Sequence, residues 1–282
     1  MSYQNCSKTV FQNKKKVIIL YDLEGIIGIV SLHPTHKKRN DSLAAHELGL
    51  VIDELREAGF SSIAICCVHN IGIDDQEIYR LIDDKQIEIV SFEELATNIS
   101  RYQYAVMIGF HGMANSGGRF DHTFRFDILS CEYNNLVIGE VGIFYRFLLN
   151  NNIKVILISG EGNFLHEIDD SIFVKNNIFT IESEYLSKND IDCEFVRFRN
   201  FLKKIFSHIE DMKSQTNQYT GNIKIAVDNN IKYKILSSEL YGFNVVANRF
   251  VFLTINNFLK DVICFCYALN DATKIIIERN RK

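Results

Sequence analysis

Four apolar runs, each long enough for one buried β-strand, constrain the fold of this chain more than any other feature. The first run, Val17 to Leu20, leads into Asp22-Leu23-Glu24-Gly25, so the strand ends at an acidic pair and the chain then breaks at glycine. Two carboxylates separated by one residue leave an extended strand on the same face, at the sheet edge where α/β proteins place ligands. A strand end with two solvated acids is the simpler alternative, and the residues further along the chain decide between the two.

The other apolar runs also end beside polar residues. The run at 62–68 (SIAICCV) precedes His69, the run at 104–110 (YAVMIGF) precedes His111, and a further run covers 155–159. Uninterrupted apolar strands of this kind are typical of a parallel sheet that is covered on both faces. The segments predicted to be helical alternate with these strands and cover residues 41–58, 74–83, 92–99 and 141–149. This alternation predicts an α/β fold with a doubly wound, mostly parallel sheet.

Turn and cap residues predict where several elements end. Asp41 or Ser42 is the expected N-cap of the helix at 41–58, and Gly59 is its expected stop. The pair Asn134-Asn135 tolerates positive φ and predicts a hairpin turn. The two strands of that hairpin are expected at 124–130 and 135–138, and a short strand is expected at 86–90.

The last third of the chain has weaker patterns. Residues 196–209 form an amphipathic helical pattern, and residues 214–219 (SQTNQY) are the predicted linker. Beyond the linker, a small α+β region is expected, with strands at 223–227 and within 243–255 and helices at 231–240 and 259–277. The predicted domains are therefore an α/β metal-binding catalytic domain at 1–213 and a small α+β C-terminal domain at 220–282.

The composition excludes several classes of function. The 282 residues are 47% hydrophobic, which is enough for a large core, and the net charge of −4 offers no basic field for nucleic acid or an anionic membrane. The longest apolar runs fall well short of the ~18 residues that a membrane span needs. The polar N-terminal residues and the short first apolar run do not form a secretion signal. Seven cysteines, an odd number, then predict reduced thiols in a cytoplasmic protein.

Five side chains with nitrogen or oxygen donors stand at the predicted strand ends or at the start of a helix. They are Asp22, Glu24, His69, His111 and Glu140. This donor set suits zinc or another borderline divalent ion. Because one catalytic zinc takes about three protein ligands, five ligands favour two metal ions that share a carboxylate, a centre suited to amide or phosphate-ester hydrolysis.

Each of these residues also has an ordinary interpretation when it is taken singly. His69 could be a hydrogen-bonded histidine at a strand end, and His111 could close a glycine turn. Glu140 could stabilise the N-terminus of the helix that follows it. The metal hypothesis therefore depends on the joint placement of the five residues.

The same stretches resemble the D-aminopeptidase (DppA-type) family of dinuclear zinc peptidases. Asp22 to Gly28 matches the family's D-x-E-G-I-x-G motif, and Val68-His69 follows the second strand as in the family. Met107 to Ala114 is similar to its G-Y/F-H-x-x-A element, Asp121-His122-Thr123 to its S-H-S/T segment, and Ile138 to Gly142 to its V-G-E-x-G motif. The order and spacing of the motifs agree over roughly half of the chain.

The resemblance implies a fold, an activity and a site. It implies that two zinc ions are bound by Asp22, Glu24, His69, His111 and Glu140, with Asp22 as the bridge. It also implies that His122 is the catalytic residue beside the metals, where an imidazole can shuttle a proton or stabilise the charge of a tetrahedral intermediate. A surface loop histidine is the alternative for His122. The expected substrate is a small peptide or amino-acid amide with a free amine, and the expected assembly is a ring-shaped homo-oligomer.

Two departures from the family pattern leave other functions open. Cys66-Cys67-Val68 precedes His69 where the family has an Asn-Asp-Ser type sequence, and Gly160-Glu161-Gly162-Asn163 replaces a Gly-Asp-Asp element. The main hypothesis is a metallo-aminopeptidase-like amide hydrolase. The alternatives are a specialised biosynthetic enzyme that cleaves or forms one particular amide, and a non-catalytic metal-binding scaffold. Nucleotide binding is disfavoured because the first strand lacks a G-x-G-x-x-G or Walker loop.

Overall fold

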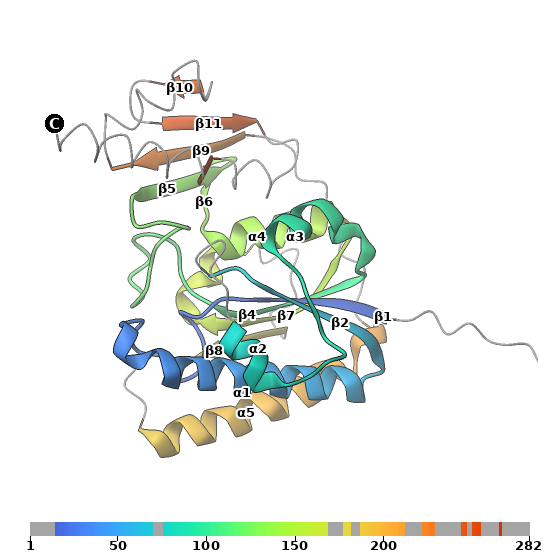
Figure 1. Ribbon diagram of the computed structural model, residues 1–282. Helices are drawn as coiled ribbons and strands as arrows, with labels where there is room; N and C mark the ends of the chain where they lie inside the picture. The colour runs from blue at the N-terminus through green and yellow to red at the C-terminus, as the bar shows by residue number, and fades with distance from the viewer. Residues whose placement is uncertain are drawn as a thin grey trace, which may run out of the picture.

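A parallel sheet forms the centre of the molecule (Figure 1). It has six strands in the order β3-β2-β1-β4-β7-β8. The computed structural model describes residues 15–69, 76–168, 177–181, 187–211, 222–228, 244–246, 250–254 and 265–266. The strands of this sheet are β1 (Lys15–Tyr21), β2 (Phe60–Cys67), β3 (Glu88–Ile89), β4 (Tyr104–Phe110), β7 (Lys154–Glu161) and β8 (Ile178–Ile181). The predicted α/β class with a doubly wound parallel sheet is confirmed.

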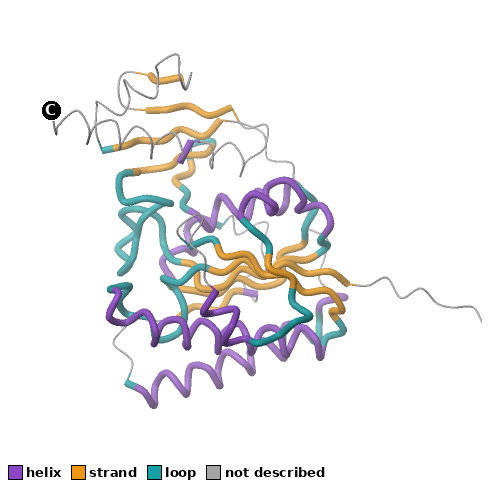
Figure 2. The backbone as a smooth tube through the Cα atoms, viewed as in Figure 1, coloured by secondary structure: helices purple, strands orange, loops and turns teal. Residues whose placement is uncertain are grey.

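Helices cover both faces of this sheet (Figures 1 and 2). One face carries α1 (Lys37–Glu57) and α5 (Lys188–Phe206), and the other carries α3 (Phe92–Asn98) and α4 (Glu140–Asn150), while α2 (Gln76–Ile82) packs on α1. Side chains of β1 alternate between two buried clusters: Ile18 and Leu20 pack on the α4 side, and Val17, Ile19 and Tyr21 on the α1 side. Burial on both faces explains why the strand sequences are apolar without interruption.

A second, antiparallel sheet has the strand order β10-β11-β9-β5-β6 (Figure 1). It contains β5 (Ile128–Tyr133), β6 (Leu136–Val137), β9 (Asn222–Val227), β10 (Asn244–Val246) and β11 (Phe250–Thr254). The turn between β5 and β6 has φ of 49° at Asn134 and 66° at Asn135, which confirms the predicted hairpin turn, although the first strand begins at Ile128 instead of residue 124. Strand β5 pairs directly with β9, so the sheet takes strands from both sides of residues 213–220. The division into domains 1–213 and 220–282 stays a prediction.

Several element boundaries differ from those predicted. Helix α1 begins at Lys37 instead of residue 41, because a 3-10 turn that starts at Pro34 leads directly into it. Asp41 therefore lies inside the helix, where its carboxylate pairs with Lys37 at 3.0 Å, and the predicted cap at Asp41 or Ser42 is wrong. Gly59, with φ of 86°, follows the end of α1 as predicted.

Helix α5 also begins earlier than predicted. Ser187 caps it through a capping box with Asp190, eight residues or more before the amphipathic pattern becomes clear. Strand β8 was not predicted, since its four residues stand in a region of weak pattern. The remaining short elements are 3-10 turns, η1 (Pro34–His36), η2 (Ile99–Arg101), η3 (Gly162–Glu167) and η5 (Ile209–Asp211).

Three sequence predictions fall wholly or mostly outside the described residues. They are the linker at 214–219, the helix at 231–240 and all but residues 265–266 of the helix at 259–277. Among the helices of the described ranges, none is both long enough and apolar enough to span a bilayer. Among the described residues, Cys66, Cys131 and Cys266 are buried free thiols.

Glu47 is a buried acid that links helix α1 to the loop after β1. Its side chain is 0% exposed; one carboxylate oxygen accepts the backbone N–H of Ile27 at 2.8 Å, and the other lies 3.4 Å from the hydroxyl of Ser159. Burial raises the pKa of Glu47 from 4.5 to about 8, against the smaller opposing effect of the Ile27 hydrogen bond. The folded chain therefore retains a proton on Glu47 at pH values where the unfolded chain has lost it.

The variant Glu47→Gln is expected to be more stable than the natural chain, by a margin that grows with pH. Because the pKa of Glu47 is higher in the folded than in the unfolded chain, its contribution to the free energy of unfolding is fully present below pH 4.5. This contribution is lost progressively as the pH rises to about 8, and above that pH the free energy of unfolding no longer changes on account of Glu47. Glutamine keeps the acceptor for Ile27 and a donor for Ser159 without the charge. Thermal unfolding between pH 5 and 9 should show a gain on the order of a few kcal/mol above pH 8. Glu57→Gln, at an exposed position of α1, is the control, and a gain that is independent of pH would contradict this assignment.

Candidate metal centre and active site

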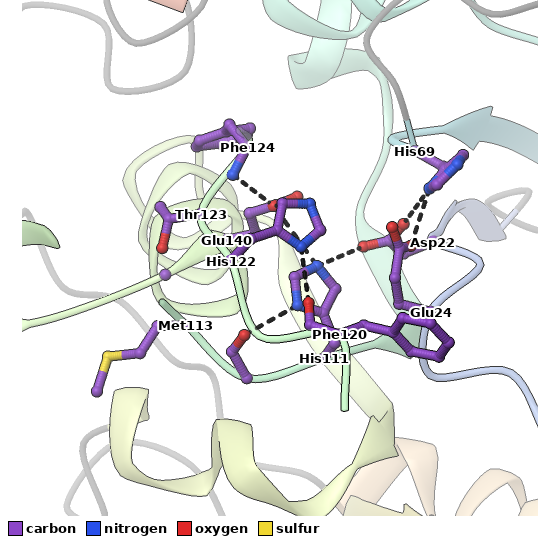
Figure 3. Close-up of polar contacts among 12 residues, drawn as sticks. Asp22, Glu24, His69, His111, Met113, Phe120, His122, Thr123, Phe124 and Glu140 are labelled. Carbon is purple, nitrogen blue, oxygen red and sulfur yellow. Dashed lines mark hydrogen bonds and ion pairs between the residues drawn. The ribbon is translucent and has the colours of Figure 1, made fainter. Parts of the chain in front are cut away.

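The six predicted site residues meet at the carboxyl edge of the central sheet (Figure 3). Asp22 and Glu24 follow β1, His69 follows β2, and His111 follows β4. Glu140 is the first residue of α4, and His122 lies in the loop between β4 and β5. Parallel strands end at one edge of the sheet, which brings residues from distant parts of the sequence together.

Glycine allows the loop after β1 to pass directly over the end of β4. The backbone N–H of Asp22 donates to Ile108 at 2.9 Å, and that of Gly25 donates to Gly109 at 2.8 Å, so the pairing continues past the strand ends. A Cβ atom at Gly25 would lie 1.9 Å from the carbonyl oxygen of Phe110. The glycine of the Asp-x-Glu-Gly stretch is thus required by close backbone approach.

The ligand atoms form three overlapping groups, within each of which all atoms lie less than 4.8 Å apart. The groups are Asp22, Glu24 and His69; Asp22, His111 and Glu140; and Glu24, His111 and His122. The two carboxylate oxygens of Asp22 face different histidines. Oδ1 lies 3.2 Å from Nδ1 of His69, and Oδ2 lies 3.4 Å from Nε2 of His111. One carboxylate therefore links two adjacent sets of possible metal ligands.

The hydrogen bond of His111 directs its Nε2 toward this cluster. Nδ1 of His111 lies 2.9 Å from the carbonyl oxygen of Gly112, which can only accept, so Nδ1 carries a proton. Nε2 faces Oδ2 of Asp22 and Oε1 of Glu140, and at 3.5 Å from the latter it makes no hydrogen bond. Both His111 Nε2 and Asp22 Oδ2 are buried without a hydrogen-bond partner among the described residues.

These unsatisfied atoms test whether a cation fits the site. Buried polar atoms in folded proteins nearly always have a partner, and a divalent cation would satisfy Asp22 Oδ2 and His111 Nε2 together. Imidazole nitrogen and carboxylate oxygen are both zinc ligands. The residues present therefore fit a zinc ion or another divalent ion of similar preference.

The charges of the cluster also favour a cation. Asp22, Glu24 and Glu140 are each at most 5% exposed. Burial raises the pKa of Glu24 to about 8, and the charge of Asp22 contributes to that rise. Burial also acts to raise the pKa of Asp22, but the neighbouring imidazoles of His111 and His69 hold that pKa well below its usual value. Although burial lowers it, the pKa of His69 rises to about 10 because Asp22 and Glu24 favour the imidazolium. The carboxylates thus create a negative field that attracts positive charge.

His122 lies against this cluster with a fixed orientation. Its Nδ1 donates to the carbonyl oxygen of Phe120 at 2.7 Å, which leaves Nε2 facing the site at 3.8 Å from Oε1 of Glu140. Its ring stacks on that of His111, with centroids 4.4 Å apart and an interplanar angle of 9°. The side chain is 12% exposed, so it lies where the cluster meets solvent.

The residues after His122 hold Glu140 in place through a strained backbone. Phe124 has φ of 57°, a left-handed conformation that is rare for a bulky side chain. In this conformation its backbone N–H donates to Oε1 of Glu140 at 2.6 Å. Strain of this kind is found where a structure holds a functional group in position.

A pocket of about 540 Å³ opens from the cluster to the surface, a size suited to a small molecule. Among its lining residues are members of the cluster and three phenylalanines that surround His122. The lining is formed by Glu24, Leu32, His69, Phe120, His122, Phe124, Arg125, Phe126 and Asp127. The phenylalanines were not predicted, although their spacing around His122 over residues 120–126 was a visible signal.

Glu167 supports the loops that carry the cluster, a role that the sequence did not reveal. It is 0% exposed, and its carboxylate accepts backbone N–H groups of Met113 at 2.9 Å, Gly139 at 2.7 Å and Gly142 at 3.1 Å. It therefore joins the loop after His111 to the first turn of α4, which carries Glu140. Burial raises the pKa of Glu167 to about 7, and the N–H groups of Gly142 and Gly139 oppose that rise. A single glutamate in a segment of mixed polarity carries no sequence signal that identifies such a role.

Glu167→Ala is expected to destabilise the chain and to weaken divalent metal binding. The substitution leaves three buried N–H groups without their acceptor, at a cost of about 1–3 kcal/mol for each group that stays unsatisfied. Chemical unfolding without metal measures the first effect, and zinc titration measures the second. Glu57→Ala is the control because Glu57 is exposed on α1. Unchanged zinc affinity would show that Glu167 does not position Glu140.

Comparison with known proteins identifies the family. The family model described as D-aminopeptidase matches residues 15–183. No curated protein matches the chain in sequence. Among solved structures, the Zn-dependent D-aminopeptidase DppA from Bacillus subtilis, a self-compartmentalizing protease, is similar with a TM-score of 0.76 at 14% identity, over 92% of this chain and 98% of that chain. At this identity the structural likeness shows a shared fold, and the family match confirms the predicted peptidase class.

The matched residues include the complete cluster, from Asp22 and Glu24 through His69, His111 and His122 to Glu140. The match also extends through Glu167, which links the supports of His111 and Glu140. The chain belongs to the D-aminopeptidase family of peptidases.

Proposed function

We propose that this chain hydrolyses an amide bond next to a free amine in a small peptide or amino-acid amide, with two zinc ions per chain. The proposed metal ligands are Asp22, Glu24, His69, His111 and Glu140, with Asp22 as the bridge. One observation carries the proposal: the carboxylate of Asp22 belongs to two separate groups of closely spaced ligand atoms. A shared carboxylate is what a site for two adjacent ions requires.

Two zinc ions, when bound, polarise a carbonyl group and make water a better nucleophile. The chain itself supplies the orientation of the ligands. The carbonyl of Gly112 fixes the proton of His111 on Nδ1, and the backbone N–H of Phe124 fixes Oε1 of Glu140. Such outer contacts typically change metal affinity or activity by about 10- to 100-fold when they are lost.

His122 is the proposed catalytic residue. Because its Nδ1 donates to the Phe120 carbonyl, the neutral ring presents the lone pair of Nε2 to the pocket, where it can accept a proton. The protonated ring would instead donate a hydrogen bond to developing negative charge on the substrate oxygen. Both roles require that Nε2 faces the reacting atoms, and its position beside Glu140 supports this.

The pocket favours an enzyme over a non-catalytic metal-binding scaffold. A scaffold would need only the ligands, whereas here an oriented imidazole and an open volume of about 540 Å³ adjoin them. An enzyme dedicated to one particular amide is the narrower form of the same proposal.

Glu161, which replaces an aspartate of the family pattern, is buried and accepts the backbone N–H of Arg119 at 3.1 Å.

We also propose a ring-shaped homo-oligomer in the cytoplasm. The similar protease from Bacillus subtilis is self-compartmentalizing, which supports assembly for a chain of the same fold. Light scattering on the purified chain tests the assembly, and a mass equal to one subunit at micromolar concentration would contradict it.

Metal analysis and substrate screening test the function directly. The purified full-length chain should bind two zinc ions, and the zinc-, cobalt- or manganese-loaded protein should hydrolyse members of a panel of D- and L-aminoacyl amides, dipeptides and N-acylated amino acids. The free-amine compounds are expected to react and the N-acylated compounds to be inert. Fewer than one tightly bound ion would reject the two-ion site, and inertness toward the whole panel by a fully loaded protein would favour the scaffold.

A further inference from the structure

Phe126 is the most exposed large apolar side chain of the described residues, and it lies at the proposed active site. Its surface is 81% exposed, whereas the other exposed apolar residues near the β5–β6 hairpin range from 37% to 47%. One face of its ring stacks on His122, with centroids 4.7 Å apart and an interplanar angle of 24°. Phe126 also lines the 540 Å³ pocket. A phenylalanine exposed beside a reactive group leaves apolar surface that a ligand can cover.

The apolar part of the pocket is built from four side chains, Phe120, Phe124, Phe126 and Leu32. Phe124 is anchored, since its ring packs edge-on against Phe144 of α4 at 5.9 Å. Phe120 lies beside His122, to which its carbonyl group is hydrogen-bonded (Figure 3). The apolar surface therefore begins next to the proposed catalytic nitrogen and extends outward to Phe126.

The pocket lining also contains two oppositely charged residues, Arg125 and Asp127, which neutralise one another. Arg125 donates to Asp127 through two hydrogen bonds, Nε to Oδ1 at 2.7 Å and Nη2 to Oδ2 at 2.9 Å. A bidentate pair of this kind satisfies both groups, so neither is suited to hold an oppositely charged side chain of a substrate. Of the remaining polar residues, Glu24 and His69 are proposed metal ligands and His122 is the proposed catalytic residue.

We infer that this pocket is a subsite for an aromatic or large aliphatic side chain of the substrate, with Phe126 as its specificity-determining residue. The inference rests on the proposed function, because it places that side chain beside the amide that the metal centre would cleave. Aromatic rings prefer offset or edge-on contacts with other rings, which Phe120 and Phe126 offer. The substrate class is therefore a peptide or amide whose free-amine residue is bulky and apolar.

Matched amides test the subsite through activity. Phenylalaninamide and alaninamide, each in D and L form, differ only in the phenyl group. The natural chain should prefer the phenylalanine compound in kcat/KM by about 10- to 100-fold, the range that apolar pockets achieve. Phe126→Ala should lose most of this preference, so that the ratio of kcat/KM between the two compounds falls toward one, and Phe126→Leu should retain part of it. Leu129→Ala is the matched control, since Leu129 is 47% exposed on β5 and does not line the pocket.

Fluorescence tests the same subsite without catalysis. The chain contains no tryptophan, so Phe126→Trp introduces a single reporter at the pocket. Phenethylamine carries the ring and the amine but no amide, and it should shift the emission to shorter wavelength in a saturable way, whereas ethylamine should not. Binding of phenethylamine without hydrolysis of any amide would overturn the proposed function and keep the subsite.

Two outcomes would overturn the subsite. Hydrolysis with equal rates for alaninamide and phenylalaninamide would do so while the proposed function stands. A preference that persists in Phe126→Ala, together with a lower oligomer mass for that variant in light scattering, would assign the exposed ring to contact with a second copy of the chain.

Discussion

Asp22→Asn is expected to lose zinc binding and amide hydrolysis together. The substitution keeps the size of the side chain but removes the negative charge that faces both His69 and His111. Asparagine also replaces one acceptor oxygen with a donor, which opposes a cation at that position. The loss of hydrolysis should exceed about 100-fold, the upper range for residues that merely orient ligands.

Thermal unfolding with and without zinc separates this effect from misfolding. A bound ion stabilises the folded state, so zinc should raise the Tm of the natural chain but not that of Asp22→Asn. The two proteins should have similar Tm values in a chelator. Asp53→Asn, at an exposed position of α1, should behave like the natural chain. A variant that keeps two zinc ions would exclude Asp22 as the bridge.

His122→Ala is expected to reduce kcat by about 10²- to 10⁴-fold, the contribution typical of a general acid or base. Zinc content should stay the same, because the two groups of ligand atoms that contain Asp22 do not include His122. The stack on His111 and the contact with Phe126 are lost as well. Because a proton-transferring residue contributes its own titration to the rate, the proposed role predicts a lower kcat together with a changed pH profile of kcat.

A structural role for His122 would give a different pattern. If the ring only supports His111, His122→Phe should restore the stack and much of the activity, whereas a catalytic role predicts that this variant stays as slow as His122→Ala. His36→Ala is the histidine control, since His36 is exposed at the start of α1. A normal turnover rate in His122→Ala would remove the proposed role.

The parallel sheet and the clustering of the site residues could be predicted because their causes are local in sequence. A strand buried on both faces needs an unbroken apolar run, so β1, β2, β4 and β7 were visible as such runs. Side chains at the ends of parallel strands meet whatever their separation along the chain, and so Asp22, His69 and His111 could be grouped from the sequence alone. The start of α1 at Lys37 was missed because a 3-10 turn that begins at Pro34 determines it, and the start of α5 at Lys188 was missed because the cap residue Ser187 determines it.

The supports of the cluster could not be predicted, since they depend on packing. Glu167 and Glu47 act through hydrogen bonds to backbone groups of distant segments, and a glutamate in sequence does not reveal which N–H it will reach. The pairing of β5 with β9 was missed for the same reason. Register between strands from distant parts of a chain is set by a shared core, here through residues such as Cys131 and Ile225.

That pairing also sets the order in which the molecule can be completed during synthesis. The loop of His122 is held between β4 and β5, but the partner strand of β5 does not begin until Asn222. At ribosomal rates of about 5–20 residues per second, β5 waits on the order of 5 to 20 s for β9 to be translated. The last of the five proposed ligands, Glu140, follows soon after β5, so these residues and His122 are all synthesised before β9, while one edge of β5 remains unpaired. A nascent chain thus contains the proposed metal ligands before it contains β9, the strand that completes the pairing of β5.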